Sequence, residues 1–356
     1  MIDFMSKSGG QGAVAKMIAE NGRLNAHAMR PFIGDDGLSY ITTFSGRDWT
    51  NPDNYGIRPI NANATLRRDE WKQLDEALVP IAESRLNGVQ DLISNGLTYN
   101  LGNAMGTTVL ENHDVSDALE AELTMDAITR TQGDRPTYGT NYLPIPIIHV
   151  DYEINMRELA ASRSLGNPID TTLAERAARK VAEKLEKMLF TATSYAFGGG
   201  TIYSYINYTN RNTGTFTAWN GSGKTAAQIL KDVQDMKQDA INAHFYGPYA
   251  LYVPSTYETV LDNDYDTTKS NTIRERLMKL SNIKIIKTVD TLTDGNIVLV
   301  QLTKDVVRLV RGMGIQNIQW QEQGNFVSKY KVMTIQVPQI RSDQDGNCGI
   351  VHYSTS

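Results

Sequence analysis

The sequence predicts an α+β protein of more than one domain, and three observations support this prediction. The chain has 356 residues, which is long for a single small core. Apolar residues recur at helical spacing in its first half and middle, whereas the part from residue 306 onward is rich in strand-like segments. Between them, residues 96–141 form an acidic stretch with no core of its own, and loops of that length are unusual inside a compact domain.

The composition excludes several classes of protein. Hydrophobic residues make up 40% and charged residues 21%, which is ordinary for a soluble globular chain without a membrane partner. The 35 basic residues do not outnumber the 40 acidic ones, so a dedicated nucleic-acid reader is disfavoured. Cys348 is the only cysteine, which excludes an internal disulfide framework and a multi-cysteine zinc site. No secretory signal is visible, and we expect an intracellular protein.

Residues 1–64 are rich in Gly and Asn and show no sustained period, so we expect an extended or partly disordered arm. Residues 65–95 form the next region, where an amphipathic helix is expected after Thr65 as its cap. The apolar positions of this helix are Trp71, Leu74, Leu78 and Ile81. Pro80 lies inside the pattern and predicts a kink or an end near Val79.

Residues 96–141 carry seven acids and two bases, and this −5 equals the net charge of the whole chain. Apolar and polar residues alternate from 119 to 127, which predicts a strand with one apolar and one acidic face. A short helix is the alternative, because Ala, Leu and Glu favour helices. The candidate contacts to another subunit are Leu119, Glu120, Glu122, Leu123, Met125, Asp126, Arg130 and Arg135.

After the acidic stretch, residues 142–154 predict a strand in which every second residue from Ile148 shares one face. The clearest helix of the chain follows at residues 171–194. Thr172 and Glu175 have the spacing of a capping box at its start. An unbroken i, i+4 stripe comprises Leu173, Ala177, Val181, Leu185 and Leu189.

The second half predicts helices and strands in alternation, and then strands alone. Helices are expected around residues 229–240, 256–261 and 273–280, and strands at 249–253, 283–287 and 297–302. Further strands are expected at 306–310, 315–320 and 326–337.

The sequence offers little catalytic chemistry. Residues 218–225 come close to a phosphate-binding loop, with Lys224 and Thr225 at the positions of its lysine and hydroxyl. Ala218 replaces the first glycine, however, and residues 213–217 do not resemble the buried parallel strand that the motif requires. We therefore interpret this segment as a turn in which Thr225 caps a helix. The five histidines are scattered, and we expect no catalytic residue, no metal and no cofactor.

Four local patterns resemble one family. Residues 145–159 contain an apolar strand followed by Arg157-Glu158-Leu159. Residues 177–184 are the part rich in Ala-Ala-Arg/Lys of a helix that ends at Phe190. This order is similar to the core of encapsulins. Residues 247–254 (Gly-Pro-Tyr-Ala-Leu-Tyr-Val-Pro) are similar to the Gly-Pro-Tyr-Ala-Leu segment of that family, and residues 71–77 resemble its N-terminal Trp-x-x-Ile-Asp-Glu-Ala helix. The resemblance spans about residues 66 to 353.

Encapsulins share the Hong Kong 97 phage-type capsid fold with the major capsid proteins of tailed phages, so the resemblance implies this fold. It implies an N-terminal arm at 1–64, a β-hairpin (the E-loop) at 96–141, and a peripheral domain formed by 142–220 and 306–356. It also implies a spine helix at 171–194 within that domain, and an axial domain at 221–305. The acidic hairpin would then bury its apolar face on a neighbouring subunit.

The resemblance implies a structural shell subunit, not an enzyme. We expect the major capsid protein of a tailed phage, assembled in the cytoplasm of a bacterial host into hexamers and pentamers of an icosahedral virion head. The head would enclose double-stranded DNA without sequence-specific binding, with scaffold, portal or decoration proteins as further partners. The alternative is an encapsulin nanocompartment that encloses a cargo enzyme, and a remote alternative is a nucleotide hydrolase that uses Lys224. No lysine occurs between Lys72 and Lys180, so a covalent link from a hairpin lysine is not expected.

Overall fold

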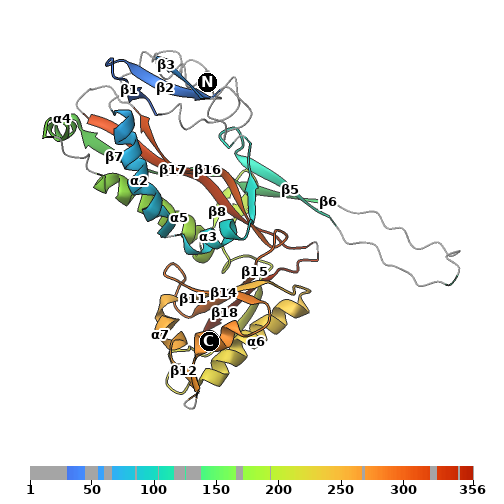
Figure 1. Cartoon of the computed structure of the whole chain (residues 1–356). Helices are drawn as coiled ribbons and strands as arrows, with labels where there is room; N and C mark the ends of the chain where they lie inside the picture. The colour runs from blue at the N-terminus through green and yellow to red at the C-terminus, as the bar shows by residue number, and fades with distance from the viewer. Residues whose placement is uncertain are drawn as a thin grey trace.

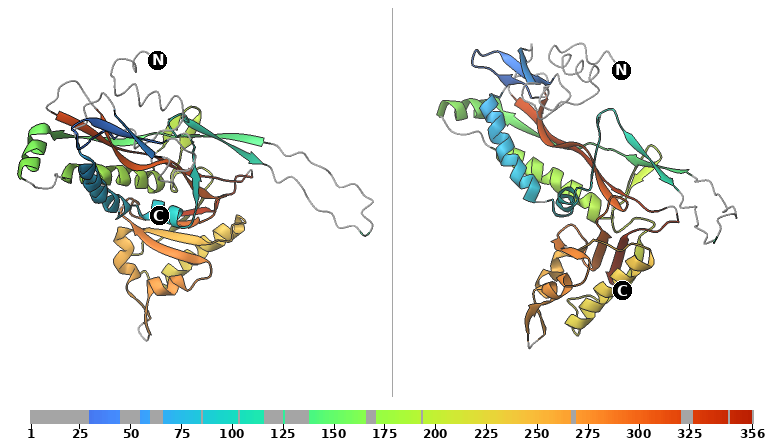
Figure 2. Two further views of the ribbon diagram at one scale, coloured as in Figure 1. Left: turned by 45° about the horizontal axis from the view of Figure 1, so that its top comes forward. Right: turned by 45° about the vertical axis from the view of Figure 1, so that its right-hand side comes forward.

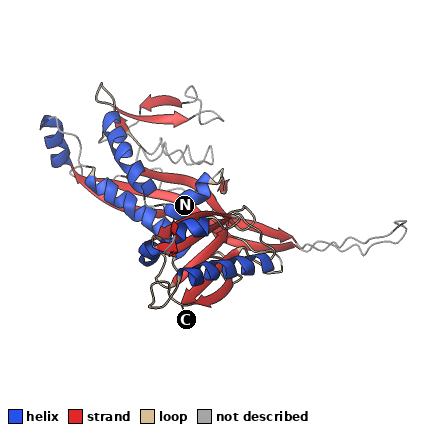
Figure 3. Ribbon diagram, turned by 60° about the horizontal axis from the view of Figure 1, so that its bottom comes forward, coloured by secondary structure: helices blue, strands red, loops and turns tan. Residues whose placement is uncertain are grey.

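The computed structural model describes two α+β bodies, one above the other in Figure 1. The ranges that it describes are 30–44, 55–59, 66–84, 86–102, 104–115, 125, 138–165, 171–192, 194–266, 269–320, 327–343 and 345–355. Strands and helices occur in both bodies, as the colouring of Figure 3 shows. In the described residues, no helix combines the length and the apolar character that crossing a membrane would require.

The upper body is built on a four-stranded sheet in the order β4-β16-β17-β7. These strands are β4 (Thr98–Asn100), β7 (Ile148–Asn155), β16 (Val307–Trp320) and β17 (Val327–Ile340). The expected strands at 306–310 and 315–320 are one strand, because β16 continues through two register shifts between Arg311 and Gln316. Such irregularities interrupt the period of two in the sequence, which explains the apparent break. In β7 the alternation from Ile148 onward is confirmed, because these residues are more buried than their neighbours.

Helix α5 (Thr172–Phe190) packs on this sheet against β7 and β17, with α2 (Arg68–Ser84) beside it. Ala177, Val181, Leu185 and Leu189 are buried as the stripe predicts, but Leu173 is exposed. The predicted capping box at Thr172 is wrong. The cap is Thr171, and its hydroxyl donates to the Glu175 carboxylate at 2.7 Å instead of accepting from a backbone N–H.

The first described residues form more than an extended arm. Strands β1 (Phe32–Ile33), β2 (Ser39–Phe44) and β3 (Tyr55–Pro59) make an antiparallel sheet, although their sequence shows no clear alternation. Phe32 is buried in one cluster with Trp71 and Leu74, so this segment contributes to the core. Helix α2 begins at Arg68 and continues through Pro80 to Ser84, so of the two outcomes expected near Val79, a kink or an end, the end is wrong.

The lower body contains a five-stranded sheet in the order β10-β18-β15-β11-β14. Its strands are β10 (Asn212–Phe216), β11 (Tyr249–Pro254), β14 (Ile283–Val289), β15 (Asn296–Gln301) and β18 (Ile350–Thr355). Around it lie α6 (Ala226–Asn242), the 3-10 turn η3 (Ser255–Tyr257), α7 (Glu258–Leu261), α8 (Ile273–Met278), and the pair β12 (Asp264–Asp266) and β13 (Lys269–Thr272).

Two strands of this sheet lie outside the range 221–305 that the sequence suggested for the axial domain. β10 precedes the range, and β18 follows it by almost fifty residues. β18 pairs in parallel with β10 and antiparallel with β15. The lower sheet is therefore completed by β18, although the resemblance implies that residues 306–356 belong to the peripheral domain.

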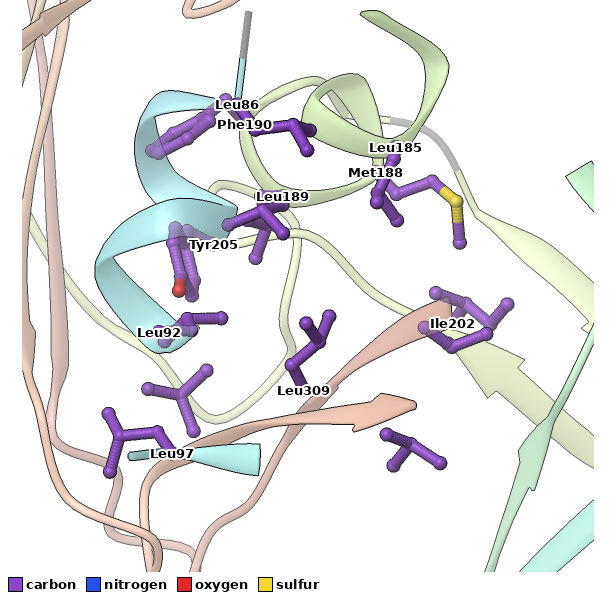
Figure 4. Packing of buried hydrophobic residues seen from close by; sticks show 14 of the residues in the cluster. Leu86, Leu92, Leu97, Leu185, Met188, Leu189, Phe190, Ile202, Tyr205 and Leu309 are labelled. Atoms are coloured by element: carbon purple, nitrogen blue, oxygen red, sulfur yellow. The ribbon is translucent and has the colours of Figure 1, made fainter. Parts of the chain in front are cut away.

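A continuous apolar core joins the two bodies. Figure 4 shows the part of it around Phe190 and Tyr205. Phe190 from α5 packs edge-on against Tyr205 and against Tyr252 of β11, with ring centroids 5.4 and 4.9 Å apart. Helix α3 (Asn87–Ser94) completes this junction. A Cβ at Gly88 would lie 2.5 Å from the Phe190 ring, so the close approach of α3 to α5 requires glycine there.

Buried polar groups stabilise the same junction. The Glu186 carboxylate of α5 accepts from the backbone N–H of Gly88 at 2.7 Å and of Val89 at 3.3 Å, which satisfies two donors in the first turn of α3. Asp91 accepts from Lys287 at 2.5 Å and from the Tyr252 hydroxyl at 3.1 Å. One polar cluster thus joins α5, α3 and two strands of the lower sheet.

Burial raises the pKa of Glu186 to about 7, although its two backbone hydrogen bonds oppose this shift. Because its pKa is higher in the folded chain, the stability that Glu186 contributes is complete below pH 4.5 and decreases as the pH rises to 7. We expect Glu186→Gln to abolish this decrease. Between pH 4.5 and 7 the free energy of unfolding should change in favour of the variant by roughly 1–3 kcal/mol. Urea denaturation of both proteins at each pH measures the difference, and parallel pH profiles would contradict it.

Candidate assembly surface

A two-stranded ribbon projects from the upper body (Figures 1 and 2). Its strands are β5 (Val109–Val115) and β6 (Tyr138–Pro144), which pair antiparallel from Val109 opposite Pro144 to Val115 opposite Tyr138. Most of its described side chains are exposed or half-buried. A pair of strands without a third strand or a packed face is only marginally stable in water. The ribbon therefore depends on contacts beyond its own two strands.

The body holds the base of the ribbon through Arg308 of β16. This guanidinium donates to Asn112 of β5 at 3.3 Å and to Gln339 of β17 at 2.6 Å. It also lies over the Tyr99 ring of β4, 4.5 Å from the ring centroid. Burial lowers the pKa of Arg308, and the neighbouring Arg341 adds to this effect. One side chain thus connects the ribbon to three strands of the main sheet.

A second hairpin lies against the ribbon, formed by β8 (Tyr195–Phe197) and β9 (Gly200–Ile202). A Cβ at Gly200 would lie 2.1 Å from the carbonyl oxygen of Tyr142, so β9 approaches β6 too closely for any larger residue. Gly198 and Gly199 have φ angles of +58° and +81°, a conformation that the turn requires and glycine adopts readily.

Exposed aromatic side chains surround this contact. Tyr142, Tyr195 and Phe197 are 41%, 51% and 53% exposed. A single exposed apolar residue is unremarkable, but exposed rings on adjoining strands are typical of an interaction surface. Sequence reasoning did not predict these two strands. The alternation of Tyr195 and Phe197 just before a glycine turn was the available signal for a hairpin.

Most of the predicted contact residues lie outside the described part of the chain. These are Leu119, Glu120, Glu122, Leu123, Asp126, Arg130 and Arg135. Met125 is described, and its side chain is fully exposed. The structure thus gives the base of the 96–141 hairpin, while the strand predicted for 119–127 stays a prediction.

The segment that approaches a phosphate-binding loop has a structural role. Lys224 is 7% exposed, and its ammonium lies 2.7 Å from Asp232 of α6. The Thr225 hydroxyl accepts from the N–H of Gln228, and the Gln228 side chain accepts from the N–H of Thr225, so the predicted cap is confirmed as a full capping box. Residues 213–217 were not expected to resemble a buried parallel strand. Most of them belong to β10, which does pair in parallel with β18 but lies at the edge of the sheet and is only partly buried. In the part that the structure describes, no group of side chains is arranged to hold a metal ion.

The fold matches capsid structures over most of the chain. A virus-like particle from Pyrococcus furiosus is similar with a TM-score of 0.60 at 15% identity, over 80% of this chain and 99% of that one. The capsid of Myoviridae Phage XM1 is similar with a TM-score of 0.57 at 10% identity, over 74% and 91%. The fold is therefore the Hong Kong 97-type capsid fold, as the sequence resemblance implied.

Among curated proteins, the type 1 encapsulin shell protein EncA of Myxococcus xanthus is 23% identical over 210 residues, which are 58% of this chain and 68% of that protein. Residues 61–353 match a family described as a family of unknown function (DUF6260), and this match includes both α+β bodies and the projecting ribbon. The chain belongs to that family.

Proposed function

We propose that the chain is a shell subunit that associates with copies of itself into hexamers and pentamers of an icosahedral capsid. The projecting β5–β6 ribbon carries this proposal, because Arg308 and the β8–β9 hairpin hold its base while most of its described side chains remain exposed or half-buried. A second copy would cover these side chains. A closed shell follows when such contacts repeat around symmetry axes.

Within this class, a tailed-phage head that encloses double-stranded DNA is the function that we favour. The three-stranded sheet β1–β3 lies before α2, and so before the part of the chain, from about residue 66, that resembles encapsulins. The likeness to the Phage XM1 capsid supports the same choice. Assembly would then take place in the cytoplasm of the bacterial host.

An encapsulin shell is the second candidate, supported by the matches to EncA and to the Pyrococcus particle. The neighbouring genes distinguish the two. Portal, terminase and protease genes would identify a phage head, and a peroxidase or ferritin-like gene would identify an encapsulin. Negative-stain microscopy of the purified chain tests the shell itself, and a protein that remains a monomer at high concentration would contradict both candidates.

The acidic hairpin gives a prediction about assembly. Reversing Glu120, Glu122 and Asp126 to Lys should reduce the yield of shells at least tenfold, because the reversed charges would repel basic residues across the contact. Raised salt should weaken wild-type assembly for the same reason. A matched control reverses the exposed Asp290, Asp305 and Asp345 to Lys. Particle counts in micrographs measure the yield of shells from each variant. Equal yields from the two would contradict a specific role of the hairpin charges in assembly.

Purified shells should dissociate to single chains in hot detergent. Because no lysine occurs between Lys72 and Lys180, the 96–141 hairpin cannot form an amide link to a neighbour through its own lysine. A denaturing gel of mature particles should show no band above the 39.6 kDa of a single chain. A ladder of cross-linked multiples would contradict this prediction.

A nucleotide hydrolase requires Lys224 to be available to phosphate, but this lysine is buried against Asp232. We expect Lys224→Ala to destabilise the fold by about 1–3 kcal/mol, because the half-buried Asp232 would lose its ion-pair partner and keep only the hydrogen bond from Trp219. Calorimetry with ATP at millimolar concentration should detect no binding to the wild-type chain. Binding that disappears in the variant would restore the enzyme hypothesis.

A further inference from the structure

The exposed charged side chains on the outward face of α5 are all positive. Its exposed charged side chains are Arg176, Lys180, Lys184 and Lys187. The acidic residues of the helix are less accessible, since Glu175 and Glu183 are half-buried and Glu186 is buried. We name the four exposed residues the basic stripe. It stands out in a chain whose acids outnumber its bases by 40 to 35.

Other long helices of the chain differ from α5 in this respect. On α6 the exposed Lys231 pairs with Asp235 at 2.8 Å, and on α2 the exposed Lys72 pairs with Glu76 at 3.7 Å. Alternating signs are typical of a helix face that only contacts water. The basic stripe therefore differs from the solvated faces elsewhere in the same molecule.

Within the described ranges, little neutralises the stripe. Lys180 forms an ion pair with Glu183 at 2.9 Å, and its side chain remains 68% exposed. The side chains of Arg176, Lys184 and Lys187 form no ion pair or hydrogen bond with another described residue. Three cations thus face outward without a partner among these residues, which leaves them available to an external anion.

The spacing of the stripe suits a long polyanion. At a rise of 1.5 Å per residue, Arg176 and Lys187 are about 16 Å apart along the axis of α5. One strand of B-DNA carries about five phosphates over that length. A row of basic side chains on a straight, exposed helix can therefore follow a phosphate backbone without contacting the edge of any nucleobase.

We propose that the basic stripe of α5 binds the phosphate backbone of double-stranded DNA without reading its sequence. The inference rests on the proposed function, because a shell must enclose DNA for this face to meet it. It goes further by assigning the contact to named residues of one helix. The acidic net charge of the chain is compatible with it, since the stripe and the acidic hairpin lie on different elements.

An acidic polypeptide fits the stripe less well. Polypeptide contacts are centred on buried apolar anchors, and the stripe offers only Leu173, at its N-terminal end, as an exposed apolar neighbour on α5. The acidic hairpin of a second copy would also need to bury Leu119, Leu123 and Met125, for which this face provides no apolar partner. A phosphate backbone needs no such anchor.

The test compares two variants with the same change in charge. The stripe variant carries Arg176→Gln, Lys184→Gln and Lys187→Gln, and the control carries Lys279→Gln, Lys284→Gln and Lys304→Gln at exposed positions of the lower body. Fluorescence anisotropy measures binding of the unassembled full chain to a labelled duplex of about 30 base pairs, from about 50 to 200 mM salt. Particle formation is followed separately by microscopy.

We expect the stripe variant to bind at least tenfold more weakly at low salt. The slope of log affinity against log salt should decrease by about 2.7, since each lost phosphate contact removes about 0.9. The control should keep the wild-type slope, and both variants should still form shells. Equal weakening in the two variants would overturn the proposal, as would displacement of the duplex by poly-glutamate at equal charge. Wild-type chains that bind DNA by the stripe but never assemble would instead remove the proposed function and leave the contact in place.

Discussion

The structure depends on the packing of α5 between two cores. The N-terminal half of this helix is buried with α2, β7 and β17, and its C-terminal half with α3 and the lower sheet. The small side chains of Ala177 and Ala178 let α2 pack close to α5. Gly88 likewise leaves room for the Phe190 ring against α3. Glu186 supplies the hydrogen-bond acceptors that the first turn of α3 lacks. The packing of α5 and the hydrogen bonds that Glu186 accepts therefore determine how the two bodies are joined.

Sequence reasoning found the elements whose own residues bury one face. The stripe of α5, the apolar run of β11 and the alternation of β7 each contain a local period, so each was predictable. β10 and β18 were missed because they are short and partly polar, and partners far away in sequence stabilise them. The projecting hairpin was expected only from the resemblance to encapsulins, because the charge and the missing core by themselves indicated a segment that is disordered or packs outside its own domain. Its anchor Arg308 was not, since nothing near residue 308 indicates a contact with Asn112.

The molecule separates its charges by element. The acids that account for the net charge of −5 belong to the 96–141 hairpin, whereas the exposed cations of α5 lie on the helical layer of the main sheet. Mixed signs on α2 and α6 give those helices no electrostatic preference for a partner. The sequence thus separates the acidic 96–141 segment from the exposed cations of α5.

The position of β18 has a consequence for biosynthesis. This strand lies between β10 and β15, so β10 cannot join the lower sheet until residues 350–355 have left the ribosome. Domains commonly fold as the nascent chain emerges, but the lower sheet cannot be completed before β18 is translated. Until then the facing edges of β10 and β15 are unpaired, and unpaired strand edges favour association with other chains, so β18 protects the lower sheet from such contacts.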